Sequence, residues 1–280
     1  MQQRRKYLMV VTAIIVVVLA MAYTLHQHWQ QHACAAQAIR VVHEVGSYKK
    51  IHVIVALCDN AHQGIVPVPA AIGNGQDTAH NLYWGARYGV KTFFLRSHEW
   101  KLVEDIANPR MPILERLIFV HVTRHVYLVA DAYDGAYMKQ AVTDVIVASA
   151  GEAPEVITIR KHPYLFGGGA DLIAFVGHDG LLDFSLDFRL TPVTIKRKDA
   201  ILLCCVSSIC FKPWMKMTGA NPLLWTTEVM CPEAYTLHDA LKGWVYGASS
   251  RIIHEQAARA YSRYQHCSVK AAKKLLKTGY

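Results

Sequence analysis

A histidine and a pair of adjacent cysteines follow two apolar segments of this 280-residue chain. His178 stands in IAFVGHDG, and Cys204 and Cys205 stand in AILLCCVSS. Short apolar runs of this kind are typical of buried strands, so both residue types are expected at strand ends. An imidazole within hydrogen-bond reach can take a thiol's proton, and the thiolate is the nucleophilic form. The pattern predicts a catalytic pair with Cys205 as nucleophile and His178 as base.

Both residues also have a structural interpretation, which the sequence leaves open. A buried cysteine is commonly a small hydrophobic residue, and a histidine at a strand end can simply be hydrogen-bonded. The two are more informative together, because their order and their positions at strand ends agree. Cys204 is expected to point to the opposite face from Cys205.

Other polar residues follow apolar runs in the same way. Asp59 and Asn60 come after HVIVALC, and Asp131 lies near the end of HVYLVADAYDG, with Asp134 behind it. Ligands of parallel sheets bind at the carboxyl ends of the strands. We therefore expect Asp59, Asn60 and Asp131 to contribute to substrate binding. Gly180 is added because glycines beside the histidine let a substrate backbone approach and offer N–H groups to a developing oxyanion.

Apolar strands alternate with helical patterns along the chain, which predicts an α/β fold with a mostly parallel central sheet flanked by helices. The apolar runs at 53–57, 126–130, 172–176 and 201–203 are expected to be central, neighbouring strands covered on both faces. The long segment 61–81 contains three glycines and two prolines. It is expected to be either a plain structural loop or a loop that faces a ligand.

The two cysteine and histidine segments resemble the caspase–hemoglobinase cysteine peptidases. That family carries its histidine after an apolar strand, in a His-Gly pair, and its cysteine at the end of the next strand. The segment TGANPLLWTTEVM (218–230) is similar to the following strand of the separase and CHAT branches. The resemblance implies a caspase–hemoglobinase-like sheet and peptidase chemistry on a peptide or protein substrate. This chain departs from the pattern by Asp179 between His178 and Gly180, and by Cys204 before Cys205.

The beginning of the chain carries Arg4, Arg5 and Lys6, followed by 17 uncharged residues from Tyr7 to Tyr23. This length fits both a signal-peptide core and a short membrane span, and the basic residues should stay cytoplasmic. We expect a signal peptide or anchor at 1–25, a linker at 26–48, an α/β domain at 49–267 and a basic tail at 268–280. The domain should be secreted, periplasmic or membrane-anchored, outside the cytoplasm.

The net charge of +9 is concentrated at the two ends of the chain. The nearly neutral centre argues against nucleic-acid binding. Phosphate-loop, dinucleotide and zinc-ligand spacings are absent from the sequence, so no cofactor and no metal are expected. The preferred interpretation is an exported or anchored cysteine hydrolase. The alternative is a catalytically inactive envelope protein of the same fold that binds a peptide or protein through the 61–81 loop.

Overall fold

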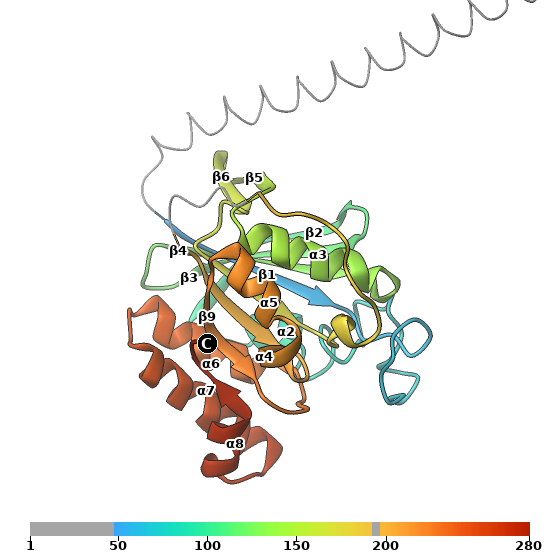
Figure 1. The fold of residues 1–280 in the computed structure, drawn as a ribbon. Helices are drawn as coiled ribbons and strands as arrows, with labels where there is room; N and C mark the ends of the chain where they lie inside the picture. The colour runs from blue at the N-terminus through green and yellow to red at the C-terminus, as the bar shows by residue number, and fades with distance from the viewer. Residues whose placement is uncertain (1–47, 192–196) are drawn as a thin grey trace, which may run out of the picture. The chain divides into compact units, whose positions relative to one another are not determined.

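The computed structural model describes residues 48–191 and 197–280, which form an α/β fold (Figure 1). Residues 158–164 belong to a compact unit separate from the rest of the described chain. The main unit contains an eight-stranded sheet in the order β10-β9-β8-β7-β1-β4-β3-β2. Its strands are β1 (Lys49–Ala56), β2 (Trp100–Arg110), β3 (Ile113–His121), β4 (Val126–Tyr133), β7 (Leu172–Val176), β8 (Asp199–Leu203), β9 (Asn221–Thr226) and β10 (Leu276–Lys277).

The centre of the sheet is parallel. Strands β4, β1, β7, β8 and β9 pair in parallel, whereas β2, β3 and β10 join antiparallel at the two sides. The four apolar runs expected to be neighbours lie in β1, β4, β7 and β8, which stand next to one another. The predicted mostly parallel sheet is therefore confirmed, and so is the adjacency of its central strands.

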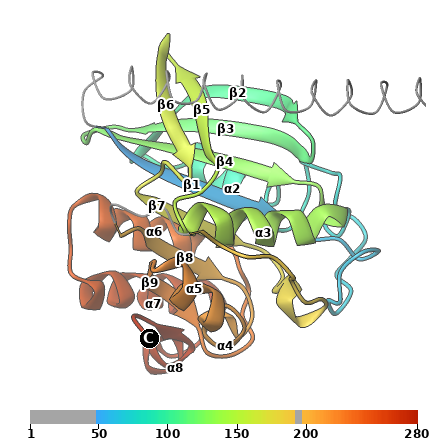
Figure 2. The same cartoon turned by 45° about the horizontal axis from the view of Figure 1, so that its top comes forward.

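Helices cover both faces of this sheet (Figure 2). Side chains of one face, such as Ile54, Phe175 and Leu202, pack with α3 (Met138–Ser149) and α5 (Lys212–Thr218). Side chains of the other face, such as Val53 and Ala174, belong to a core with residues of α2 (Val90–Leu95), α6 (Ala234–Val245) and α7 (Ser250–Gln265). Alternate residues of one strand thus enter opposite cores, which explains why the strands read as continuous apolar runs.

The structure adds elements that the sequence pattern did not predict. β2 is a long edge strand whose residues are mostly exposed, so it lacks an apolar run. The residues expected to be a basic tail form α8 (Val269–Leu275) and β10, and β10 pairs with β9. Short elements complete the unit: η1 (Gly135–Tyr137), η2 (Gly180–Leu182) and α4 (Ser207–Cys210). β5 (Pro154–Ile159) and β6 (His162–Gly167) form a separate two-stranded sheet.

Within residues 48–191 and 197–280, no helix is both long and apolar enough to cross a bilayer. The expected signal peptide or anchor at 1–25 lies outside the described residues. So does the expected linker at 26–48, apart from Tyr48.

Candidate functional site

The register of two parallel strands places His178 and Cys205 at the same edge of the sheet. β7 and β8 are neighbours, and Val176, the last residue of β7, is paired with Leu203, the last of β8. The Gly177 amide still donates to the Leu203 carbonyl at 3.3 Å. Continuing this register by two residues brings His178 beside Cys205. Parallel strands lie about 4.8 Å apart, so the two backbones are close enough for their side chains to share a site.

A sharp turn follows Cys205 immediately. Val206 has φ 46° and ψ 27°, the left-handed conformation, before α4 begins at Ser207. A β-branched residue rarely adopts this conformation, because its side chain then crowds the backbone. Strain of this kind costs about 1–3 kcal/mol and is concentrated at functional sites. A strained turn between strand and helix also occurs in the α/β-hydrolases.

His178 and Cys205 both line a cavity of about 570 Å³ at this edge. Its remaining lining is mostly apolar and comes from four segments: the 61–81 loop, the two residues after that loop, the turn after β7 and the segment that follows β9. The lining residues are Gly64, Ile65, Val66, Val68, Leu82, Tyr83, Gly177, Leu182, Val229, Met230, Cys231, Pro232 and Glu233. The volume falls in the ~300–1,000 Å³ range of sites that hold a small ligand.

A carboxylate orients His178. The Nε2 atom of His178 lies 2.8 Å from Oδ2 of Asp183, and the same oxygen accepts the Gly64 amide at 2.9 Å. With Nε2–H donated to Asp183, Nδ1 is the nitrogen that can accept a proton. Asp183 was not predicted from the sequence. Its spacing of five residues from His178 matches no motif, and only the fold of η2 brings it back to the ring.

Cys205 is half-buried, and its sulfur contacts the backbone of Met230. Sγ lies 3.5 Å from the Met230 nitrogen and 3.7 Å from the Met230 oxygen. The bonds given for the two side chains lead to other residues: His178 to Asp183, and Cys205 to Met230. Catalytic contacts are often long in a site without substrate and tighten when it binds.

Most other thiols near this edge are poor nucleophiles. Burial raises the pKa of Cys58 to about 11 and that of Cys210 to about 11, and it raises the pKa of Cys204 still more strongly. The Cys231 thiol is exposed, but desolvation together with the nearby Glu233 carboxylate raises its pKa. Each of these thiols is protonated at neutral pH and therefore reacts slowly.

Asp59 and Asn60 hold the start of the 61–81 loop, and their side chains are occupied by other parts of the chain. Asp59 accepts the Ala61 amide and lies 2.7 Å from Nδ1 of His62. Asn60 bonds both backbone groups of Val68, with Nδ2 to the oxygen at 2.8 Å and Oδ1 to the nitrogen at 2.9 Å. Neither residue lines the cavity, whereas Val68 does. They position the loop that forms the cavity wall.

Gly180 is buried behind the cavity. A Cβ atom at this position would meet Met138 and Phe184 at 2.7 Å, so the absence of a side chain serves packing against α3. Gly180 does not line the cavity; of the glycines beside His178, Gly177 does.

Asp131 lies inside β4, because that strand continues to Tyr133. Its fully buried carboxylate accepts bonds from Arg116 at 2.6 and 2.7 Å and lies 3.0 Å from Nε2 of His52. Although burial alone would raise its pKa, the bonds from Arg116 and His52 lower the pKa of Asp131 to about 2. Asp131 thus belongs to a buried ion cluster, away from the edge that holds His178.

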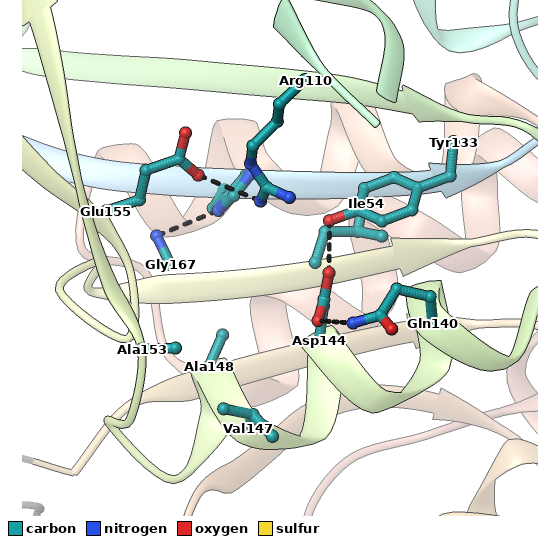
Figure 3. Close-up of a pocket in the computed structure, with 11 residues that line it drawn as sticks. Ile54, Arg110, Tyr133, Gln140, Asp144, Val147, Ala148, Ala153, Glu155 and Gly167 are labelled. Carbon is teal, nitrogen blue, oxygen red and sulfur yellow. Dashed lines mark hydrogen bonds and ion pairs between the residues drawn. The ribbon is translucent and has the colours of Figure 1, made fainter. Parts of the chain in front are cut away.

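A second cavity, of about 240 Å³, is lined by His52 of this ion cluster and by Glu155, which binds Arg116. Figure 3 shows residues that line this cavity. Tyr133 and Gln140 both donate to the Asp144 carboxylate at 2.7 Å, and Arg110 pairs with Glu155. Its polar groups bind one another across the cavity, and none of the predicted site residues lines it. Among the described residues, no cluster of His, Cys, Asp and Glu has the arrangement of a metal site.

Comparison of the chain with protein families, with curated protein sequences and with solved structures finds no match. The site is therefore interpreted from its own geometry. That geometry brings His178 and Cys205 to one cavity, assigns Asp59 and Asn60 to its supporting loop, and separates Asp131 and Gly180 from it.

Proposed function

We propose that this protein is a cysteine hydrolase of peptidase type, with Cys205 as nucleophile and His178 as base. The observation that carries the proposal is the register of β7 and β8, which leads both residues to one apolar cavity. In this mechanism His178 Nδ1 takes the thiol proton, and the thiolate attacks a substrate carbonyl to form an acyl-enzyme. His178 then returns the proton to the leaving amine, and water releases the acyl group.

Two further features support the proposal. Asp183 fixes the tautomer and orientation of His178, as the third member of a nucleophile–base–carboxylate arrangement does. The left-handed turn at Val206 holds Cys205 at the sheet edge. The order of strand, histidine, next strand and cysteine also resembles the caspase–hemoglobinase peptidases, so we propose the same family of folds for this sheet.

The test is hydrolysis of a mixed peptide library, followed by mass spectrometry, for the parent protein and three variants. Cys205→Ala should abolish cleavage while leaving the melting temperature nearly unchanged. His178→Ala should slow it by about 10²-fold or more, the usual contribution of a general base. Cys204→Ala is the matched control, because Cys204 is fully buried in the opposite core, and it should retain cleavage.

Alkylation with iodoacetamide provides an independent readout. At neutral pH Cys205 should be modified faster than Cys58, Cys204, Cys210 and Cys231, whose pKa values are raised. His178→Ala should remove that advantage. Slow modification of Cys205 in both proteins, with no cleavage by the parent, would favour the alternative function.

That alternative is a catalytically inactive envelope protein of the same fold that binds a peptide or another protein through the 61–81 loop, part of which lines the cavity. It is favoured by the exposed apolar residues around the cavity mouth, which suit a binding surface with or without chemistry. On either function the protein lies outside the cytoplasm, secreted, periplasmic or anchored by its N-terminal segment.

A further inference from the structure

The cavity beside Cys205 has almost no charged groups in its wall. Its lining contains neither Lys nor Arg, and its only acidic residue is Glu233. That carboxylate accepts bonds from the Tyr235 hydroxyl at 2.9 Å and from the Gln265 amide at 3.1 Å. An anionic substrate side chain entering the cavity would lose its water without gaining a cationic partner, and a cationic one would meet only Glu233, whose Oε2 already accepts two bonds.

The two most exposed large apolar side chains of the described residues, Val66 and Val229, line this cavity, and so does the exposed Leu182. Val66 is 88% exposed, Val229 is 75% exposed and Leu182 is 55% exposed, and all of them line it. They come from three separate segments: the 61–81 loop, η2 and the segment after β9. Large apolar side chains gathered from distant parts of a chain around one opening mark a site that binds an apolar group.

The buried and half-buried part of the cavity wall is mostly apolar as well. Ile65, Val68 and Leu82 are half-buried, whereas Tyr83 and Met230 are buried. The volume of about 570 Å³ exceeds what a small side chain needs. Burial of apolar surface contributes roughly 25 cal/mol per Å², so a large side chain would gain more here than a small one.

We infer that the cavity receives a large, uncharged apolar side chain of a peptide substrate, such as Leu or Phe, next to the carbonyl that Cys205 attacks. This inference rests on the proposed function and adds its substrate class. Val66, Val229 and Leu182 are the specificity-determining residues, because they line the cavity and are its exposed large apolar side chains.

The test uses peptide acyloxymethyl ketones that differ only in the residue next to the reactive group: Leu, Phe, Gly, Asp or Arg. The rate of Cys205 labelling is measured by mass mapping. The Leu and Phe probes should react at least about tenfold faster than the Gly, Asp and Arg probes, in line with the discrimination of an apolar pocket. Val229→Asp should slow the Leu and Phe probes and accelerate the Arg probe. Val122→Asp is the matched control, because Val122 is 53% exposed and does not line the cavity.

The outcomes separate the substrate class from the chemistry. Equal rates for all probes, or a preference for Asp or Arg, would overturn the apolar substrate while leaving the nucleophile in place. If no probe labels Cys205, the proposed catalysis fails. The substrate class is then decided by calorimetry on the Cys205→Ala variant, with peptides that carry Leu or Asp at the tested position. Tighter binding of the Leu peptide supports the apolar site, and equal binding contradicts it.

Discussion

His178 and Asp179 are neighbours in the chain whose side chains have different roles. His178 lines the cavity and is oriented by Asp183. Asp179 is fully buried and caps η2 by accepting the Leu181 amide at 3.1 Å. The Asp179 between His178 and Gly180 therefore has a structural use.

The buried Asp179 should limit stability at neutral pH. Desolvation raises its pKa to about 6, so the folded protein holds this proton more tightly than the unfolded chain does. The stabilising contribution of the protonated form is complete below pH about 4 and is lost as the pH rises through about 6. Asp179→Asn keeps a capping oxygen and removes the charge. It should therefore stabilise the protein by about 1–3 kcal/mol at pH 8.

The measurement is urea unfolding of parent and variant from pH 4 to pH 8. The stabilisation by Asp179→Asn should fall towards zero at pH 4, where the Asp179 carboxyl of the parent is already neutral. Asp187→Asn is a suitable control because Asp187 is exposed in the same segment. A gain that stays constant with pH would mean that the charge of Asp179 is not its cause.

The 61–81 loop is an element whose shape depends on a few side chains. Asn60 alone bonds both backbone groups of Val68, and a Cβ at Gly73 would collide with the Asn60 amide at 2.4 Å. The sequence predicted a long loop here but left open whether it faces a ligand. Whether this loop faces a ligand depends on contacts such as that of the Gly64 amide with the Asp183 carboxylate. This contact joins residues 119 positions apart, so no local sequence pattern predicts it.

Removing the Asn60 amide should loosen the cavity wall. Asn60→Ala deletes both bonds to Val68, at a local cost of about 1–3 kcal/mol. Hydrogen exchange should therefore accelerate at the Val68 amide, while the β7 amides stay protected. Asn74→Ala is the control, since the exposed Asn74 side chain only accepts the Gln76 amide within its own turn. Unchanged exchange at Val68 would show that the loop is held by its apolar contacts instead.

The central strands were the most predictable elements. Residues buried on both faces must be apolar throughout, so β1, β4, β7 and β8 stand out in the sequence. Edge elements are exposed and polar, and they depend on pairing with distant segments. For that reason β2 and β10 were missed. Asp131 was expected at a strand end, but β4 continues to Tyr133, and the Asp131 carboxylate pairs with Arg116 inside the sheet.

The same reasoning gives a direct test of the strand core. Ala174 is fully buried in β7, between Val53 of β1 and Ile201 of β8. Ala174→Asp would bury an unpaired charge and should destabilise the protein by about 4 kcal/mol or more. Ala271→Asp provides the matched control. Ala271 is exposed in the first turn of α8, where an acidic residue is favourable. The melting temperature of the Ala271→Asp variant should therefore not fall. Equal melting of the two variants would contradict the central position of β7.

At the scale of the whole molecule, the sequence predicts the compartment in which the protein acts. The prediction of export depends on Arg4, Arg5 and Lys6 ahead of the uncharged run from Tyr7 to Tyr23, all of which lie outside the described residues. The basic residues should stay cytoplasmic and the chain after the run should cross. The α/β domain with its cavity would then meet substrates outside the cytoplasm.

A fusion after Tyr280 tests this orientation. The Tyr280 hydroxyl donates to the Ala220 carbonyl at 3.1 Å, so a reporter needs a flexible linker to leave the fold intact. An enzyme that is active only outside the cytoplasm should be active in this fusion. The double variant Val16→Lys, Val17→Lys should abolish the reporter activity. Two charges at the centre of the uncharged run from Tyr7 to Tyr23 cost roughly 5–7 kcal/mol on membrane insertion. A reporter that is active only in the cytoplasm would contradict export, and the substrate would then have to be a cytoplasmic peptide.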